Sequence, residues 1–307
     1  TIYSLNCLPL GGFCKIKGEN GEEIAHSDSF GFQKAWKRLL VLVSGVGMNF
    51  VLAAVLLGIG FVVGLPADFS GGLPSSAIVV QNPQVMIQQV EQGSPAELAG
   101  LRFGDRVLSL NGEPVETSEE MISFIREFGH NYVAFVIERN GERLTYDIQG
   151  RLNEEENQYR IGAVLADVGM IRYPWYASFF KGFAAAAIGL LNIFISLYLL
   201  LKHMILGQGL VFDVAGPVGI AVMIGESARM GFQYLLNMTA MISLSLAAVN
   251  ILPIPALDGG RVFFLGVEKL IGRPVALKYE QTAHTVGFVL LMILVVLVTG
   301  RDVLRLL

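Results

Sequence analysis

Apolar residues in this chain are gathered into long blocks instead of being spread along amphipathic patterns. Three blocks contain no Asp, Glu, Lys or Arg, and they cover 39–65, 230–257 and 281–300. Each has about 20 residues or more, which at roughly 1.5 Å per helical residue is enough to cross a hydrocarbon core of about 30 Å. The pattern therefore predicts transmembrane helices at 39–65, 230–258 and 281–300.

Two weaker apolar stretches, 183–201 and 210–225, fall in the region 177–229. Basic side chains bracket the first stretch, and Gly216-Pro217 interrupts the second. We expect membrane-embedded or interfacial helices in 177–229, with 179–205 lying in or on the membrane instead of spanning it. A hairpin of two true crossings is the alternative.

Between the first two blocks the chain becomes polar, and 84–152 has the pattern of a small water-soluble domain. A strand is predicted at 85–90, and the spacing of Met121, Ile122 and Ile125 predicts a helix over 118–128. Asn140-Gly141 lies between two candidate strands and is a strong signal for a β-hairpin. The predicted fold class is a polytopic α-helical membrane protein with an inserted small α/β soluble domain.

The distribution of Lys and Arg predicts the orientation. Basic residues precede the first block and follow the second, which places 1–38 and 259–280 on the cytoplasmic side. The soluble domain then faces outward. Short apolar segments on either side of Gly11-Gly12 suit a membrane-associated β-hairpin or loop within 1–38.

Composition narrows the classes of function. Of the 307 residues, 53% are hydrophobic and 16% are charged, against about 25% charged residues in ordinary soluble domains. The formal net charge of -4 gives no basic field for nucleic acid, so no DNA or RNA partner is expected. An ordinary soluble enzyme and a disordered chain are excluded, and the expected partner is a lipid bilayer.

The segment from Asn250 to Arg261 carries the candidate chemistry. Pro253 and Pro255 each remove a backbone donor, so the helix of the second block is expected to break near membrane depth. Asp258 follows the break, and a carboxylate inside a membrane indicates a functional site. The alternative is that Asp258 only caps a helix over 259–271. The residues alone support the two interpretations about equally.

Asn250 to Gly260 resembles the Asn-x-x-Pro-x-Pro-x-Leu-Asp-Gly-Gly signature of the site-2 protease family, which are intramembrane zinc metalloproteases. Bacterial regulator-of-sigma-E proteases belong to this family. Four further stretches resemble the family in the same order along the chain, namely 8–13, 49–50, 91–106 and 215–220. The third of these is similar to the start of a PDZ domain, so the inserted domain is expected to be PDZ-like.

The resemblance implies a Zn²⁺ ion that activates water for hydrolysis. Asp258 corresponds to the third metal ligand of the family. The loop at Gly11-Gly12 would hold the substrate as an added strand, because a helical substrate must unwind before its backbone is accessible. The residues expected to contact substrate are Asn250, Asn49, Gly11, Gly12, Pro253 and Pro255.

One departure from the family pattern concerns the zinc site. The His-Glu-x-x-His motif, which supplies two ligands and the general base, is absent from these residues. We expect the motif and its general-base Glu upstream of Thr1, in a part of the protein truncated from this chain. Exposure explains each of the four histidines better than zinc binding does; these are His26, His130, His203 and His284.

The implied function is cleavage of transmembrane segments in single-span membrane proteins, such as anti-sigma factors or signal-peptide remnants. The implied location is a bacterial inner membrane, with the PDZ-like domain on the periplasmic side. That domain would either bind a peptide or restrict access to the active site by its bulk. A catalytically inactive adaptor is the first alternative function, and a transporter or channel is the second.

Overall fold

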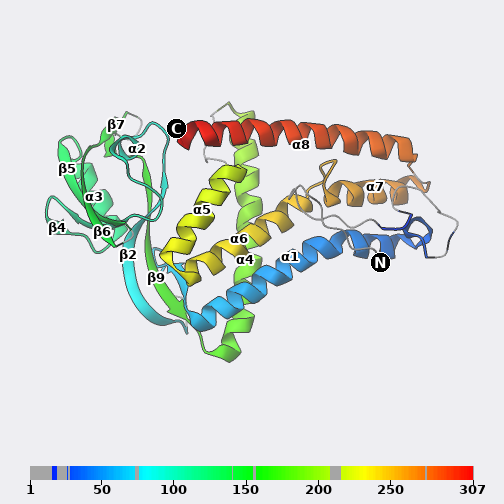
Figure 1. Cartoon of the computed structure of the whole chain (residues 1–307), viewed down its shortest axis with the longest axis horizontal. Coiled ribbons are helices and arrows are strands. Elements are labelled where there is room, and N and C mark those ends of the chain that lie inside the picture. Colours follow the sequence, from blue (N-terminus) through cyan, green and yellow to red (C-terminus); the bar gives the residue numbers. More distant parts are fainter. Residues whose placement is uncertain are drawn as a thin grey trace. The chain divides into compact units, whose positions relative to one another are not determined.

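The chain forms two compact units, which are described separately. The first consists of Thr1–Met48 and Val249–Leu294, and the second of Asn49–Ala248 and Val295–Leu307. Figure 1 shows the computed structural model with its elements labelled. The structure describes residues 16–18, 26, 28–72, 76–139, 141–154, 157–207, 216–273 and 275–306. The predicted β-hairpin with Gly11 and Gly12 lies outside these residues.

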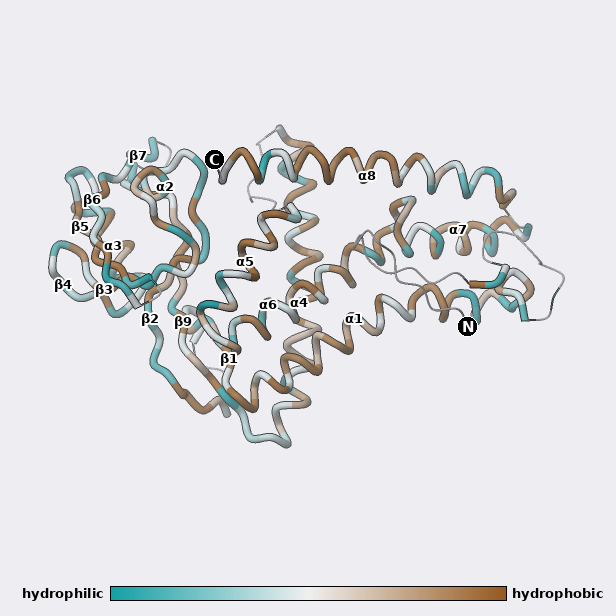
Figure 2. Tube along the Cα trace, in the orientation of Figure 1, coloured by the Kyte–Doolittle hydropathy of each residue, from teal (hydrophilic) through white to brown (hydrophobic). Residues whose placement is uncertain are grey.

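Four of the described helices are long and apolar enough to cross a membrane. They are α1 (Ala35–Val63), α4 (Trp175–Ile205), α6 (Phe232–Asn250) and α8 (Leu277–Leu306). Figure 2 shows that hydrophobic residues predominate along all four. Three coincide with the predicted blocks, and α4 is the additional candidate. The shorter helical elements outside the sheet domain are η1 (Phe30–Phe32), α5 (Pro217–Met230) and α7 (Asp258–Ile271).

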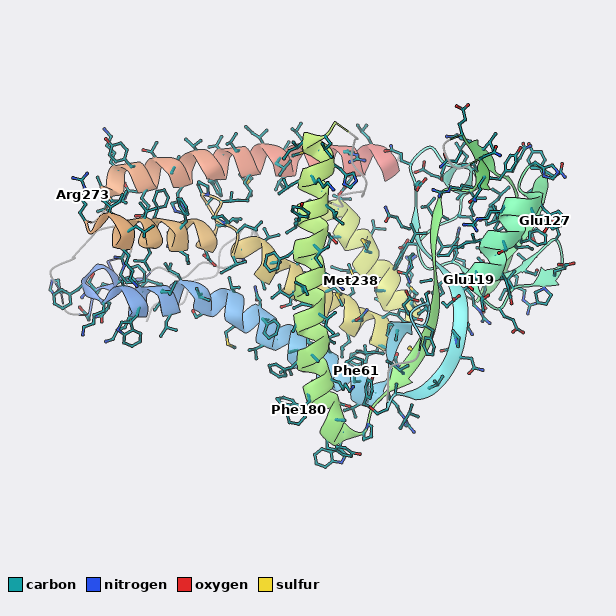
Figure 3. All side chains as sticks on the ribbon, turned by 180° about the vertical axis from the view of Figure 1, so that it is seen from behind. Phe61, Glu119, Glu127, Phe180, Met238 and Arg273 are labelled. Carbon is teal, nitrogen blue, oxygen red and sulfur yellow. The ribbon has the colours of Figure 1, made fainter. Side chains whose placement is uncertain are left out.

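Small residues bring α4 close to α1 within the second unit. A Cβ on Gly182 of α4 would lie 2.5 Å from the carbonyl oxygen of Ala54, and one on Gly58 of α1 would lie 3.5 Å from that of Ser178. Both helices therefore present small residues four positions apart, which lets their backbones approach. Figures 1 and 3 show α4 passing steeply across α1 and α6.

The two-crossing alternative for 177–229 needs a second helix of membrane length after α4. The next described helix, α5, has 14 residues. About 20 helical residues are needed to cross the hydrocarbon core, so α5 is too short for a full crossing.

The second unit also contains an antiparallel sheet with two helices. The strand order is β1 (Leu65–Asp68), β9 (Ala163–Arg172), β2 (Ile78–Val90), β3 (Arg106–Leu110), β5 (Tyr132–Arg139) and β6 (Glu142–Gln149). β4 (Glu113–Pro114) pairs with β3, and β7 (Arg151–Asn153) pairs with β8 (Gln158–Arg160). The helices are α2 (Pro95–Ala99) and α3 (Ser118–Phe128). The predicted helix at 118–128 and the hairpin of β5 and β6 are confirmed.

Local sequence explains why α3 begins where it does. The Thr117 side chain accepts a hydrogen bond from the Glu120 N–H, and the Glu120 carboxylate accepts one from the Thr117 N–H. This reciprocal pair satisfies two backbone donors at the helix start. Met121 and Ile125, which carry the predicted helical spacing, are buried in the core with Phe135.

The sheet extends beyond the predicted boundaries of 84–152 at both ends. β2 begins at Ile78, and β9 lies between β1 and β2 in the sheet. In sequence, the polar segment after residue 152 has the composition expected at the end of a domain. In the structure it leads to β9, whose partner strands β1 and β2 are far away in the chain, so local pattern alone does not predict β9.

Candidate metalloprotease site

The helix break predicted after Asn250 is present. α6 ends at Asn250, and α7 begins at Asp258. We call the connecting residues 251–257 the proline loop. Its two prolines cannot donate to a helical ladder, which explains why α6 does not continue. Ala256 has φ of +85°, a left-handed conformation that non-glycine residues rarely adopt.

Gly259 and Gly260 are needed where the proline loop folds against the start of α7. A Cβ on Gly259 would clash with the carbonyl groups of Ile251 and Leu252. A Cβ on Gly260 would lie 2.5 Å from the carbonyl oxygen of Ile254. Both glycines are buried, so the loop turns back tightly over the first turn of the helix.

Asp258 is partly buried at the first position of α7, and its carboxylate makes no hydrogen bond or ion pair with any described residue. The cap position belongs to Leu257, and no side chain caps the helix. The interpretation of Asp258 as a helix cap is therefore wrong.

The surroundings of Asp258 leave space at the carboxylate. A Cβ on Gly45 of α1 would lie 3.8 Å from Asp258 Oδ2, so no side chain of this residue covers the oxygen. Arg38 near the start of α1 forms an ion pair of 3.0 Å with Glu268 of α7. This pair links the two helices of the first unit that flank the carboxylate.

An unpaired carboxylate oxygen beside a glycine fits the role of one zinc ligand, because Asp oxygen is an ordinary donor to Zn²⁺. The described part of the chain contains no group of three or more His, Cys, Asp or Glu side chains that could hold a metal. Asp258 is therefore a candidate for one donor only, and the described residues do not form a complete metal site by themselves.

The predicted substrate-contacting residues fall in different places. Asn250 is the last residue of α6, Pro253 is exposed in the proline loop, and the carbonyl of Pro255 faces Gly287 of α8. The Asn250 side chain makes no hydrogen bond within the described structure. Asn49 belongs to the second unit, where its backbone carbonyl accepts a hydrogen bond of 2.9 Å from Ser243 Oγ.

His284 is the contact that sequence patterns missed. Its Nδ1 accepts a hydrogen bond of 2.9 Å from the backbone N–H of Ala256, so exposure does not explain this histidine. His26 and His130 are exposed, as predicted, whereas His203 Nδ1 lies 2.7 Å from the carbonyl oxygen of Leu199 one turn earlier. No motif or spacing identifies His284, because its partner lies 28 residues away.

A groove of about 270 Å³ lies between α3 and the start of β9. Ile122, Ile125 and Arg126 line its helical side, and Gly162 and Ala163 lie at its other side. β1 pairs only with 168–171 of β9, so no described strand covers β9 at 163–166 on that side. An open strand edge beside a helix can accept an extended peptide by strand addition.

The described residues thus combine membrane-length helices, a helix break beside a carboxylate that makes no hydrogen bond, and an inserted sheet domain. The chain belongs to peptidase family M50, because the sequence model of that family matches residues 1–294. This is the family of zinc metalloproteases that the resemblance indicated.

Two relatives illustrate the match. A Clostridium perfringens protein, whose name assigns it to the zinc metalloproteases, is 34% identical over 305 residues, covering 99% of this chain and 84% of that protein. The regulator of sigma-W protease RasP of Bacillus subtilis is 30% identical over 299 residues, covering 96% of this chain. The matched chain spans 65% of the length of RasP.

Among solved structures, a PDZ domain of an SdrC-like protein from Listeria monocytogenes is similar to 29% of this chain and to 93% of its own length. Its sequence identity to this chain is 21%, and the TM-score is 0.26.

Proposed function

We propose that the full-length protein is an intramembrane protease that cleaves transmembrane segments of single-span membrane proteins. The observation that carries the proposal is the unpaired Asp258 carboxylate at the break between α6 and α7. Membership in peptidase family M50 supports the hydrolytic chemistry. Helices of membrane length support a site inside the bilayer.

Zinc, when bound, polarises the scissile carbonyl and lowers the pKa of its water toward about 7. The residues of this chain would do the remaining work. Asp258 would hold the metal through one oxygen. The Asn250 amide, free at the end of α6, would donate to or accept from the unwound backbone of the substrate. Pro253 and Pro255 keep the backbone irregular, which leaves room for that strand.

The orientation is part of the proposal. The basic residues near the start of α1 and along α7 support a cytoplasmic side for both in a bacterium, and the sheet domain would then lie outside the inner membrane. The length and apolar composition of α4 support a helix that is embedded in the membrane. Single-span substrates, such as anti-sigma factors or signal-peptide remnants, would then enter beside the proline loop.

The first test compares full-length wild type with Asp258→Ala in cleavage of a single-span model substrate. Cleavage should be abolished because the metal loses a ligand, and zinc affinity should fall. Asp147→Ala is the matched control, since this carboxylate is exposed on β6. Unchanged zinc binding and cleavage in Asp258→Ala would contradict the proposal. A wild type that never cleaves but binds partners would favour the adaptor, and ion flux would favour the channel.

The open edge of β9 favours peptide binding by the sheet domain as a second function. Ile122→Arg places a charge in the groove, whereas Ser123→Arg adds the same charge on another face of α3. Fluorescence anisotropy with peptides that end in an apolar residue should show at least tenfold weaker binding for Ile122→Arg and wild-type binding for Ser123→Arg. If wild type binds none of the peptides, the domain acts by its bulk.

A further inference from the structure

Within residues 252–257 of the proline loop, one backbone donor is not satisfied by a local turn. The N–H groups of Leu252, Ile254 and Leu257 donate to backbone carbonyls two or three residues earlier. Pro253 and Pro255 have no N–H to satisfy. The Ala256 N–H instead donates to a side chain of α8. Ala256 is also the loop residue held in the left-handed conformation, two residues before Asp258.

α8 touches the loop at two positions on one of its faces. His284 Nδ1 accepts from the Ala256 N–H at 2.9 Å. Three residues later, Gly287 lies so close to Pro255 that a Cβ would clash with the Pro255 carbonyl oxygen. Residues three apart share a helix face, so His284 and Gly287 contact neighbouring peptide units of the loop.

The hydrogen bond also determines the tautomer of His284. Nδ1 is the acceptor, so in the neutral ring the proton lies on Nε2. Nε2 is buried and has no partner among the described residues. The ring centroid lies 5.9 Å from that of Phe264 on α7. The imidazole therefore contacts the loop before Asp258 and the helix after it.

We propose that His284 is a positioning residue for the Asp258 carboxylate. By accepting from the Ala256 N–H, it keeps Ala256 left-handed and so fixes the direction in which the chain enters α7 at Asp258. The inference rests on the proposed function, because it takes Asp258 as a metal ligand. His284 itself does not touch the metal.

Paired substitutions separate the two ring nitrogens. In the full-length protein, His284→Asn retains an acceptor near the position of Nδ1, whereas His284→Gln places its amide near Nε2. His284→Ala and His284→Gln should lose about 10- to 100-fold in zinc affinity, measured by competition with a chelator. His284→Asn should keep most of the wild-type affinity. In cleavage assays, kcat should fall for the first two variants while KM stays unchanged.

Ala256→Gly provides a second test, which distinguishes loss of the hydrogen bond from a general loss of packing. Glycine adopts the left-handed conformation without help from a hydrogen bond. The double variant His284→Ala with Ala256→Gly should therefore recover zinc affinity relative to His284→Ala alone. Thr282→Ala is the control on α8, since this hydroxyl bonds only the carbonyl of Lys278 in its own helix.

The outcomes separate this inference from the proposed function. Wild-type zinc affinity and cleavage in His284→Ala, with loss of both in Asp258→Ala, would overturn the role of His284 alone. Rescue by Gln but not by Asn would also overturn it, because Nε2 would then be the working atom. Wild-type behaviour in Asp258→Ala would overturn the proposed function. If His284→Ala fails to fold, the comparison of His284→Asn with His284→Gln decides.

Discussion

At the scale of single residues, the site depends on atoms that are absent as much as on those that are present. Gly259 and Gly260 let the proline loop fold onto α7, Gly287 admits the Pro255 carbonyl, and Gly45 leaves Asp258 uncovered. Gly259, Gly260 and Gly287 are explained by a close approach of backbone carbonyl groups, whereas Gly45 leaves space beside the carboxylate. A carboxylate at a tight turn can then stay unpaired, since no neighbouring side chain reaches it.

Gly259→Ala should therefore destabilise the protein, whereas replacing an ordinary glycine within a helix by alanine does not. Its new methyl group would meet two backbone carbonyls, so we expect a loss of about 1–3 kcal/mol in the free energy of unfolding and weaker zinc binding. Gly266→Ala in the same helix meets nothing within 4 Å and should be stabilising by up to about 1 kcal/mol. Thermal unfolding in detergent checks both, and equal effects would contradict the explanation.

A second residue-scale prediction concerns the buried ion pair of the sheet domain. Asp105 is fully buried and accepts two hydrogen bonds of 2.6 Å from Arg139, whose pKa is raised chiefly by this contact. Asp105→Ala leaves the guanidinium without its partner and should cost about 3–5 kcal/mol. The more exposed pair of Arg106 and Glu138 joins the same strands, so Glu138→Ala should cost at most about 1 kcal/mol. Denaturant unfolding measures both.

At the scale of elements, local patterns predicted the helices, and the structure shows how they meet. The helix over 118–128, the hairpin around Asn140-Gly141 and the end of α6 before Pro253 follow from spacing, turn residues and proline. β9 could not be found in this way, because its place between β1 and β2 depends on partners about 80 to 100 residues away. The contact of His284 with Ala256 was hidden for the same reason.

The crossing of α4 over α1 is testable at this scale. Gly182→Leu would push a large side chain against the backbone of Ala54 and Gly58, so the crossing should open and the unfolding temperature in detergent should fall. Gly47→Leu in α1 is the control, because a Cβ there has no neighbour within 4 Å. A larger loss in the control would show that the close approach has no importance for stability.

At the scale of the whole molecule, the described residues contain only part of the site that a zinc protease requires. The described residues provide Asp258 and its supporting loop, and the family relation provides the metal. The sequence motif selects Asp258 as the expected metal ligand, and that role stays a prediction. The motif does not show that the carboxylate lacks a hydrogen bond to the described residues, because that depends on the tertiary structure around the start of α7, including Gly45.

The sheet domain enters and leaves through strands that pair with each other. β1 follows α1 and β9 precedes α4, and Asp68 stands opposite Val168 in their register. Close to the helices, the Tyr173 N–H donates to the Phe61 carbonyl at 2.8 Å. Replacing everything between Asp68 and Val168 by an Asn-Gly turn should therefore keep α1 and α4 joined by a short hairpin.

Such a shortened protein should still cleave small substrates, measured by the same assay as for Asp258. If the domain acts by its bulk, substrates with large outer domains should become cleavable, and if it acts by peptide binding, cleavage of its ligands should slow. Loss of all cleavage would show that the domain is needed to hold the helices.

The pairing of β1 with β9 also makes the sheet domain an exchangeable insertion. Because both ends are held side by side, a different domain could be inserted at the same point without altering the distance between α1, which precedes it, and α4, which follows it. A force applied to a partner bound to the inserted domain would be transmitted to α1 and α4 together, because β1 and β9 are paired. An architecture of this kind lets the sheet domain diverge in sequence while α1 and α4 stay unchanged.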